Sequence, residues 1–139
     1  MNFHIRNLVN VQGEKVEIVI EDGLLASKIS QGSVYQEFDG AGLTVLPGFV
    51  DLHTHLREPG REDAETVLTG SRAAVAGGFT AISAMPNTLP VADTAGVVEQ
   101  VYRLGQHHGL CDAYPIGAVT IGQEGEHLAE LSAMNQSEA

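Results

Sequence analysis

The first part of the chain, residues 1–45, has the hydrophobic pattern of a small β region. Short apolar and β-branched stretches alternate there with glycine-rich turns, which is typical of strands joined by tight connections. We expect three strands, at residues 3–11, 16–20 and 24–29. An Asp22-Gly23 dipeptide between the last two predicts a hairpin turn. The glycine-rich remainder of the region is predicted to be loop.

From residue 46 onward, short apolar runs alternate with segments of helical spacing. The pattern predicts buried strands at residues 49–56, 79–84 and 112–119, and helices at residues 64–75, 94–108 and 124–134. Strands spaced roughly 30 residues apart fit right-handed parallel βαβ units. Periodicity alone does not separate an open doubly wound sheet from a (β/α)8 barrel. Either topology places functional loops at the carboxyl ends of the strands.

Two histidines end the first strand of this second region. Side chains alternate along a strand, so Asp51, His53 and His55 are expected on one side. Two imidazoles spaced in this way can both reach one divalent cation, which makes His53 and His55 candidate metal ligands. A His-x-His pair also occurs by chance, but here it precedes a polar loop. Asp51 could orient a histidine ring or simply accept a hydrogen bond from a backbone N–H group.

An arginine and an asparagine follow the first two strands of the βαβ pattern. They are expected to lie close together, in neighbouring loops at the carboxyl ends of these strands. The guanidinium of Arg57 offers a bidentate fork to a carboxylate, and the amide of Asn87 can add a hydrogen bond. The alternative for Arg57 is a surface salt bridge with Glu58 or Glu62. The alternative for Asn87 is a loop-stabilising role beside Pro86.

Composition excludes some classes of function. The chain has 7 Lys and Arg against 18 Asp and Glu, a formal net charge of −11, which argues against a nucleic-acid surface. Its lone Cys111 excludes an internal disulfide, suits a reducing compartment and is expected to be a small apolar filler. Neither a membrane-spanning run nor the apolar core of a signal peptide is present, so a cytoplasmic location is expected. His4 is expected to be a surface or strand histidine without a chemical role.

Two motifs carry a resemblance to a known family. Pro-Gly-Phe-Val-Asp-Leu-His-Thr-His-Leu-Arg-Glu-Pro-Gly at residues 47–60, followed by Met-Pro-Asn-Thr at residues 85–88, closely resembles dihydroorotases of the long bacterial type, in the amidohydrolase superfamily. The match covers nearly the whole chain and is best at residues 46–122. The first motif marks the superfamily. Its Leu-Arg-Glu-Pro-Gly extension and the second motif favour dihydroorotase within it.

The resemblance implies an α/β fold: the N-terminal part of a metal-dependent (β/α)8 TIM-type barrel at residues 46–139, preceded by strands of a small β-sandwich at residues 1–45. It also implies that His53 and His55 hold one or two zinc ions, and that Arg57 and Asn87 bind the substrate's free carboxylate. The activity would be reversible hydrolysis of L-dihydroorotate to N-carbamoyl-L-aspartate in pyrimidine biosynthesis.

The length of the chain departs from this family. A complete barrel needs about 250 residues, so we expect a truncated chain with negligible turnover whose general-base aspartate lies beyond Ala139. The intact protein is expected to be a homo-oligomer that binds a small-molecule substrate. The alternatives are a hydantoinase- or allantoinase-type hydrolase, and a non-catalytic dihydroorotase-like subunit that scaffolds aspartate transcarbamoylase. Typical hydantoinase and allantoinase substrates lack the ring carboxylate that Arg57 and Asn87 would bind.

Overall fold

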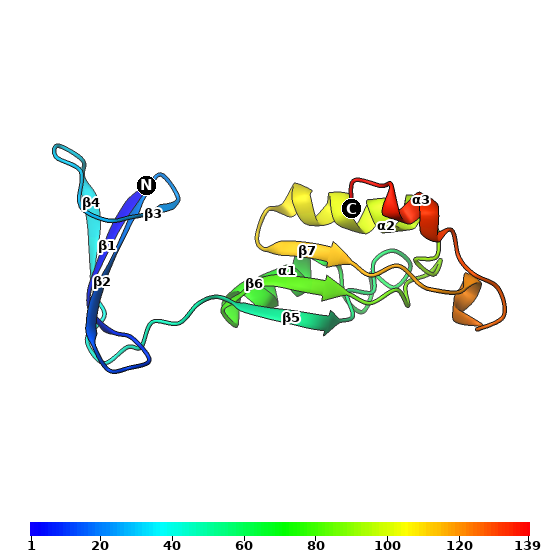
Figure 1. Cartoon of the computed structure of the whole chain (residues 1–139), viewed down its shortest axis with the longest axis horizontal. Coiled ribbons are helices and arrows are strands. Elements are labelled where there is room, and N and C mark those ends of the chain that lie inside the picture. The colour runs from blue at the N-terminus through cyan, green and yellow to red at the C-terminus, as the bar shows by residue number, and fades with distance from the viewer. The chain divides into compact units, whose positions relative to one another are not determined.

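Two β-sheets, one in each part of the chain, organise the computed structural model, which describes all 139 residues. The chain divides into two units, Met1–Pro47 and Gly48–Ala139. The first unit is a mixed sheet, and the second combines a parallel sheet with helices (Figure 1). The α/β class is therefore confirmed.

The first unit is a four-stranded sheet with the strand order β3-β2-β1-β4. Its strands are β1 (Asn2–Val9), β2 (Lys15–Glu21), β3 (Leu24–Ala26) and β4 (Tyr35–Asp39). The first three strands were expected. The predicted hairpin turn is confirmed, because Asp22 and Gly23 adopt positive φ angles of 51° and 81° between β2 and β3.

The fourth strand falls where the sequence predicts loop. β4 has the sequence Tyr-Gln-Glu-Phe-Asp, in which polar residues outnumber apolar ones, and it pairs in parallel with β1. Because so few of its residues are apolar, hydrophobic periodicity gives little signal for this strand. What places it in the sheet is its pairing with β1, which is distant in the sequence.

His4 lies in β1, but its side chain is buried rather than at the surface, with 6% of its area exposed. Its Nε2 atom lies 2.9 Å from a carboxylate oxygen of Glu17 on β2. Its Nδ1 atom lies 3.7 Å from Glu37 on β4. The residue is therefore hydrogen-bonded to the neighbouring strand β2, whereas its buried Nδ1 atom has no hydrogen-bond partner.

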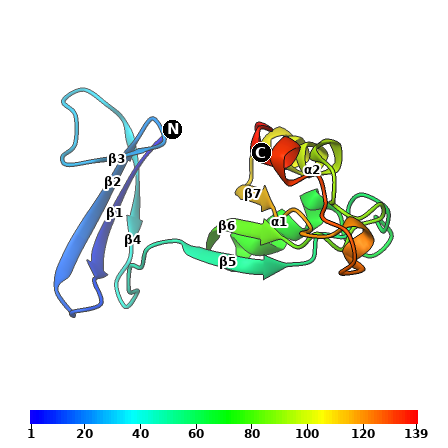
Figure 2. The same cartoon turned by 45° about the vertical axis from the view of Figure 1, so that its right-hand side comes forward.

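The second unit is built on a three-stranded parallel sheet with the order β5-β6-β7. The strands are β5 (Phe49–Thr54), β6 (Phe79–Ala84) and β7 (Asp112–Pro115), connected by helices α1 (Val67–Ala76) and α2 (Ala95–His108). A short 3-10 helix, η1 (Ile121–Gln123), and helix α3 (Leu131–Asn135) follow. The three strands lie side by side in both views of the molecule (Figures 1 and 2).

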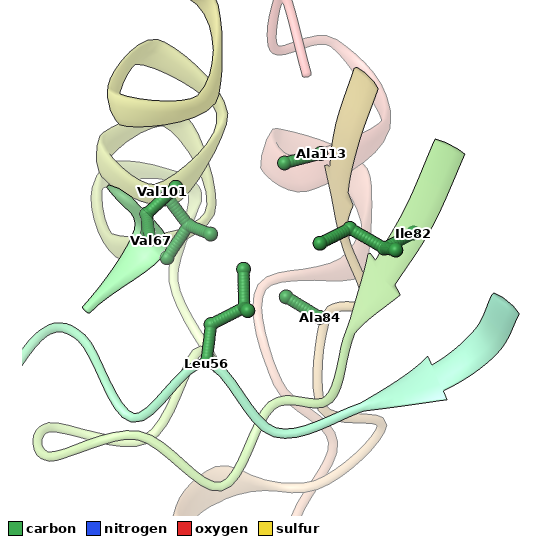
Figure 3. Packing of buried hydrophobic residues seen from close by; sticks show 6 residues of the cluster. All are labelled: Leu56, Val67, Ile82, Ala84, Val101 and Ala113. Carbon is green, nitrogen blue, oxygen red and sulfur yellow. The ribbon is translucent and has the colours of Figure 1, made fainter. Parts of the chain in front are cut away.

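The core of this unit lies between the sheet and its two connecting helices. Val67 of α1 and Val101 of α2 point towards Ile82 on β6, and all three are at most 2% exposed (Figure 3). The same cluster includes Leu56, Ala84 and Ala113. Because both helices contribute to this one cluster, they cover the same face of the sheet.

Helix α1 begins three residues later than the hydrophobic spacing indicates. Thr66 caps it, because its hydroxyl accepts a hydrogen bond from the Thr69 N–H group at 3.0 Å and its own N–H group donates to the Thr69 hydroxyl at 2.9 Å. This reciprocal arrangement satisfies two backbone donors and fixes the start of the helix. Three acidic residues, Glu62, Asp63 and Glu65, lie in the loop that precedes the helix.

The predicted helix at residues 124–134 is largely wrong. The chain forms a loop there, and only α3 at its end is helical. Gly125 has a positive φ angle of 81°, which is incompatible with a continuous right-handed helix over these residues. The strand expected at residues 112–119 is also shorter and ends at Pro115.

Strand β5 is an exposed edge strand, which corrects the expectation that it is buried. Side chains of Phe49, Val50 and Leu52 are 47%, 58% and 72% exposed. β5 pairs only with β6, so its other edge is unpaired. Apolar composition predicted the strand correctly but not the exposure of its side chains.

No helix of the chain combines the length and the apolar character needed to cross a membrane.

We predict that Ile82→Ala lowers the free energy of unfolding by about 2–5 kcal/mol, because it leaves a cavity in the core. Ile121→Ala is the matched control: Ile121 is 54% exposed, and its truncation should change stability by less than about 0.5 kcal/mol. Urea denaturation followed by circular dichroism measures both. Equal effects of the two substitutions would contradict the assigned core.

Candidate functional site

The carboxyl ends of β5 and β6 lie next to each other and are fixed by hydrogen bonds. Thr54 pairs with Ala84, and the Met85 N–H group donates to the Thr54 carbonyl at 2.8 Å. The Thr54 hydroxyl also donates to the Ser83 carbonyl at 2.9 Å. These bonds set where the chain leaves each strand, and therefore where the following loops begin.

The loops that follow these two strands are docked to each other. The Leu89 N–H group donates to the Pro59 carbonyl at 2.9 Å. Gly60 has a φ of +102°, and a Cβ atom there would lie 2.1 Å from the Leu89 carbonyl oxygen. Only glycine fits this backbone conformation and this close approach. The Pro-Gly dipeptide at the end of the first motif is thus needed for the close packing of the two loops.

Acidic residues of the first loop stabilise its backbone. Glu58 accepts a hydrogen bond from the Val67 N–H group at 2.7 Å, at the start of α1, where a negative charge is favourable. Glu62 accepts one from the Gly60 N–H group at 2.8 Å. This hydrogen bond lowers the pKa of the Glu62 carboxyl group. Both residues are part of the loop scaffold.

Arg57 lies at the start of this loop in a left-handed backbone conformation, with a φ of 59°. Its half-buried side chain makes no ion pair with Glu58, Glu62 or any other carboxylate of the chain. The neighbouring Arg61, by contrast, binds Asp63 at 3.1 Å. The salt-bridge alternative for Arg57 is therefore not observed.

A register shift interrupts the pairing of β5 between Asp51 and Thr54. Asp51 accepts a hydrogen bond from the backbone N–H group of His53 at 3.0 Å, so its carboxylate satisfies a backbone donor and not a histidine ring. β5 ends at Thr54, which leaves His55 one residue beyond the strand. The irregularity breaks the strict alternation expected along residues 51–55.

The two histidines nevertheless lie close together. The ring centroids of His53 and His55 are 5.2 Å apart, with an interplanar angle of 67°. Both side chains are exposed. Two imidazoles that bind one tetrahedral ion through nitrogen atoms at about 2.0–2.1 Å have ring centroids roughly 5 Å apart. The observed separation is thus compatible with two ligands of a single ion.

No group of three or more His, Cys, Asp or Glu side chains is arranged to hold a metal ion. Within the chain, His53 and His55 therefore offer two nitrogen donors and not a complete set of metal ligands.

Asn87 contacts one of the two histidines directly. Its Oδ1 atom lies 2.8 Å from Nδ1 of His55. The residue sits in the loop after β6, whose Thr88 hydroxyl donates to the Pro90 carbonyl at 2.7 Å. The structure thus brings Asn87 to the end of β5. The sequence predicted that Asn87 lies near Arg57, at the carboxyl ends of neighbouring strands. It did not predict the hydrogen bond between Asn87 and His55, for which neither motif contains a separate signal.

Cys111 takes no part in this site. It immediately precedes β7, at the amino end of a strand, whereas the histidines lie at the carboxyl end of β5. Burial, with a smaller contribution from Asp112, raises the pKa of its thiol, which disfavours the nucleophilic thiolate. It packs beside the core cluster, in agreement with its expected role as a small apolar filler.

Comparisons with known proteins agree on one family. The family model described as "Dihydro-orotase-like" matches residues 42–139. Dihydroorotase of Streptomyces coelicolor is 58% identical in an alignment of 140 positions, which covers 97% of this chain and 32% of that protein. Dihydroorotase of Leifsonia xyli is 68% identical over 101 residues, 73% of this chain and 23% of that protein. Dihydroorotase of Mycobacterium tuberculosis is 48% identical over 131 residues, 92% of this chain and 30% of that protein. The chain spans about a third or less of the length of these relatives.

Solved structures share the fold. The L-hydantoinase (dihydropyrimidinase) of Arthrobacter aurescens superposes with a TM-score of 0.64 at 24% identity, over 85% of this chain and 28% of that one. A prolidase complexed with N-methylphosphonate-L-proline superposes with a TM-score of 0.51 at 16% identity, over 97% of this chain and 38% of that one. At these identities the similarity concerns the fold alone.

We predict that Gly60→Ala separates the two loops, because the new Cβ atom collides with the Leu89 carbonyl. Hydrogen exchange of the Leu89 amide should accelerate. Gly125→Ala is the matched control, since Gly125 also has a positive φ (+81°) but no atom within 4 Å of the added Cβ. It should leave the Leu89 amide unaffected. A Leu89 amide that stays protected in Gly60→Ala would contradict the loop contact.

Proposed function

The chain belongs to the dihydroorotase-like family, and from that premise we propose that it forms the N-terminal part of an enzyme that reversibly hydrolyses L-dihydroorotate to N-carbamoyl-L-aspartate. This reaction belongs to pyrimidine biosynthesis. The observation that carries the proposal is the contact between His55 and Asn87 at 2.8 Å, because it joins a candidate metal ligand to a candidate substrate ligand.

We also propose that the second unit is the beginning of a (β/α)8 barrel, and that the first contributes strands to a β-sandwich. The strand order β5-β6-β7 runs in one direction, and α1 and α2 pack on one face. Consecutive parallel strands with their connecting helices on one face are the arrangement found in a (β/α)8 barrel. The similarity to the L-hydantoinase fold supports the same assignment.

In the proposed reaction, water adds to the ring amide of dihydroorotate. The water oxygen bonds to the amide carbon, the carbon–nitrogen bond breaks, and a proton is transferred to the nitrogen. Zinc, as one or two ions, would supply polarisation of the carbonyl group and activation of water. His53 and His55 would hold the metal, and an aspartate beyond Ala139 would transfer the proton.

Arg57 and Asn87 are proposed to bind the carboxylate that remains attached to the ring. Arg57 makes no ion pair within the chain, so its guanidinium is available for a bidentate contact with that group. Hydantoin and allantoin lack such a ring carboxylate. The pair therefore favours dihydroorotate over the substrates of the related hydrolases.

We predict that the 139-residue chain alone has negligible turnover, because two histidines hold zinc weakly and the proposed proton-transferring aspartate is absent. Joining it to the C-terminal two thirds of the Streptomyces coelicolor relative should give an active chimera. Hydrolysis of dihydroorotate by both proteins is measured under identical conditions with added zinc. Robust turnover by the short chain would refute the proposed division of the site. A metal-free complex of this chain with aspartate transcarbamoylase would instead support a scaffold role.

In that chimera, Arg57→Ala should raise KM for dihydroorotate by roughly 10- to 100-fold, because about 1.5–3 kcal/mol of charge-assisted binding is lost. Arg61→Ala is the matched control, because that guanidinium is bound to Asp63, and it should leave KM unchanged. Assays of both variants on dihydroorotate, hydantoin and allantoin test the specificity. Equal loss on all three substrates would argue against carboxylate recognition by Arg57.

A further inference from the structure

The ring of His55 is restrained by a hydrogen bond, whereas the ring of its neighbour is not. Nδ1 of His55 lies 2.8 Å from Oδ1 of Asn87. An amide oxygen only accepts hydrogen bonds, so the proton of this bond belongs to the imidazole Nδ1 atom. No side-chain hydrogen bond within the chain involves the ring of His53. A hydrogen bond to Asn87 therefore fixes the tautomer of His55, and no side chain of this chain does so for His53.

A proton on Nδ1 leaves the lone pair on Nε2. Neutral imidazole binds a metal through its unprotonated nitrogen, and a hydrogen bond at the other nitrogen selects which one that is. Asn87 thus holds His55 in the form whose Nε2 atom is free to act as a ligand. The other end of the asparagine, its Nδ2 group, donates no hydrogen bond to another side chain of this chain and remains available.

The contact depends on the strand register and not on burial, because both side chains are exposed. Hydrogen bonds at Thr54 fix the end of β5 against β6. The bond from Leu89 to Pro59 fixes the loop that carries Asn87. The backbone therefore presents Asn87 to His55 before any ligand binds, and the geometry is built into the two loops.

We propose that Asn87 is a positioning residue for His55, which selects its Nδ1–H tautomer and orients its ring, in addition to contacting the substrate. This inference rests on the proposed function for the identity of the ligands that the two residues share. One side chain then serves both halves of the site: its oxygen sets the histidine, and its amino group is left for the substrate carboxylate. Replacing that amino group and removing the oxygen should therefore have separable effects.

The tautomer is measured directly by long-range ¹H–¹⁵N NMR correlation of the histidine rings in the 139-residue chain, at a pH where imidazoles are neutral. We expect the Nδ1–H form for His55 in the unmodified chain and in Asn87→Asp, whose carboxylate still accepts the bond. In Asn87→Ala, His55 should shift towards the Nε2–H form. His53 serves as the internal control and should not change. Asn135→Ala, an exposed substitution at the end of α3, should alter neither ring.

A second measurement uses the chimera and its affinity for zinc, determined with a competing chelator. Asn87→Ala should weaken zinc binding by about 10- to 100-fold, the usual effect of removing a hydrogen-bond partner of a ligating histidine. Asn87→Asp should keep zinc affinity but raise KM for dihydroorotate, because its negative charge repels the substrate carboxylate. This split is not expected of a residue that merely stabilises the loop.

An Nε2–H tautomer of His55 in the unmodified chain would overturn the proposal, and so would an Asn87→Ala variant with an unchanged tautomer. Retained protection of the Leu89 amide in each variant shows that the loops are intact. An inactive chimera with the expected tautomers would count against the proposed reaction and not against the role of Asn87. The two failures are therefore distinguishable.

Discussion

The parallel pairing of β5 with β6 is the constraint on which the site depends. Thr54 pairs with Ala84, and the two chains leave the sheet at this level towards His55 and Asn87. Because His55 and Asn87 lie shortly beyond these strand ends, a shift of the register would move one of them along the strand direction relative to the other. The hydrogen bonds of Thr54 to the neighbouring strand specify the register more sharply than the apolar side chains of β5, which are largely exposed.

Around this pairing, the polar residues divide into those satisfied within the chain and those left available. Glu58 and Glu62 accept backbone hydrogen bonds, and Arg61 binds Asp63. Arg57 has no such partner although it lies among these acidic groups. The loop thus satisfies its own charges and leaves one guanidinium free, which is the condition for recognising an external anion in a chain of strongly negative net charge.

Sequence patterns predicted the second unit well where local signals agreed with packing. Phe79–Ala84 is a strand at the expected residues, because its apolar run is flanked by a glycine pair and a proline. Predictions failed where long-range pairing or backbone conformation decides, as in β4 and in the loop around Gly122. The strand pattern predicted Asn87 beside Arg57, at the carboxyl ends of the first two parallel strands. Its hydrogen bond to His55 depends on the conformations of two loops that are distant in the sequence. The spacing of residues within either motif does not determine those conformations.

Gly60 packs against the Leu89 carbonyl and has a purely structural role, although it lies only three residues from Arg57, which is proposed to bind the substrate. The glycine keeps two loops at a constant spacing and has no side chain with which to touch a ligand, whereas Arg57 and Asn87 carry the proposed substrate contacts. Redesign for a different cyclic amide could therefore exchange the arginine and the asparagine while keeping the glycine. Conversely, a related protein that has this glycine but lacks the arginine and the asparagine would share the packing of the two loops and not the substrate.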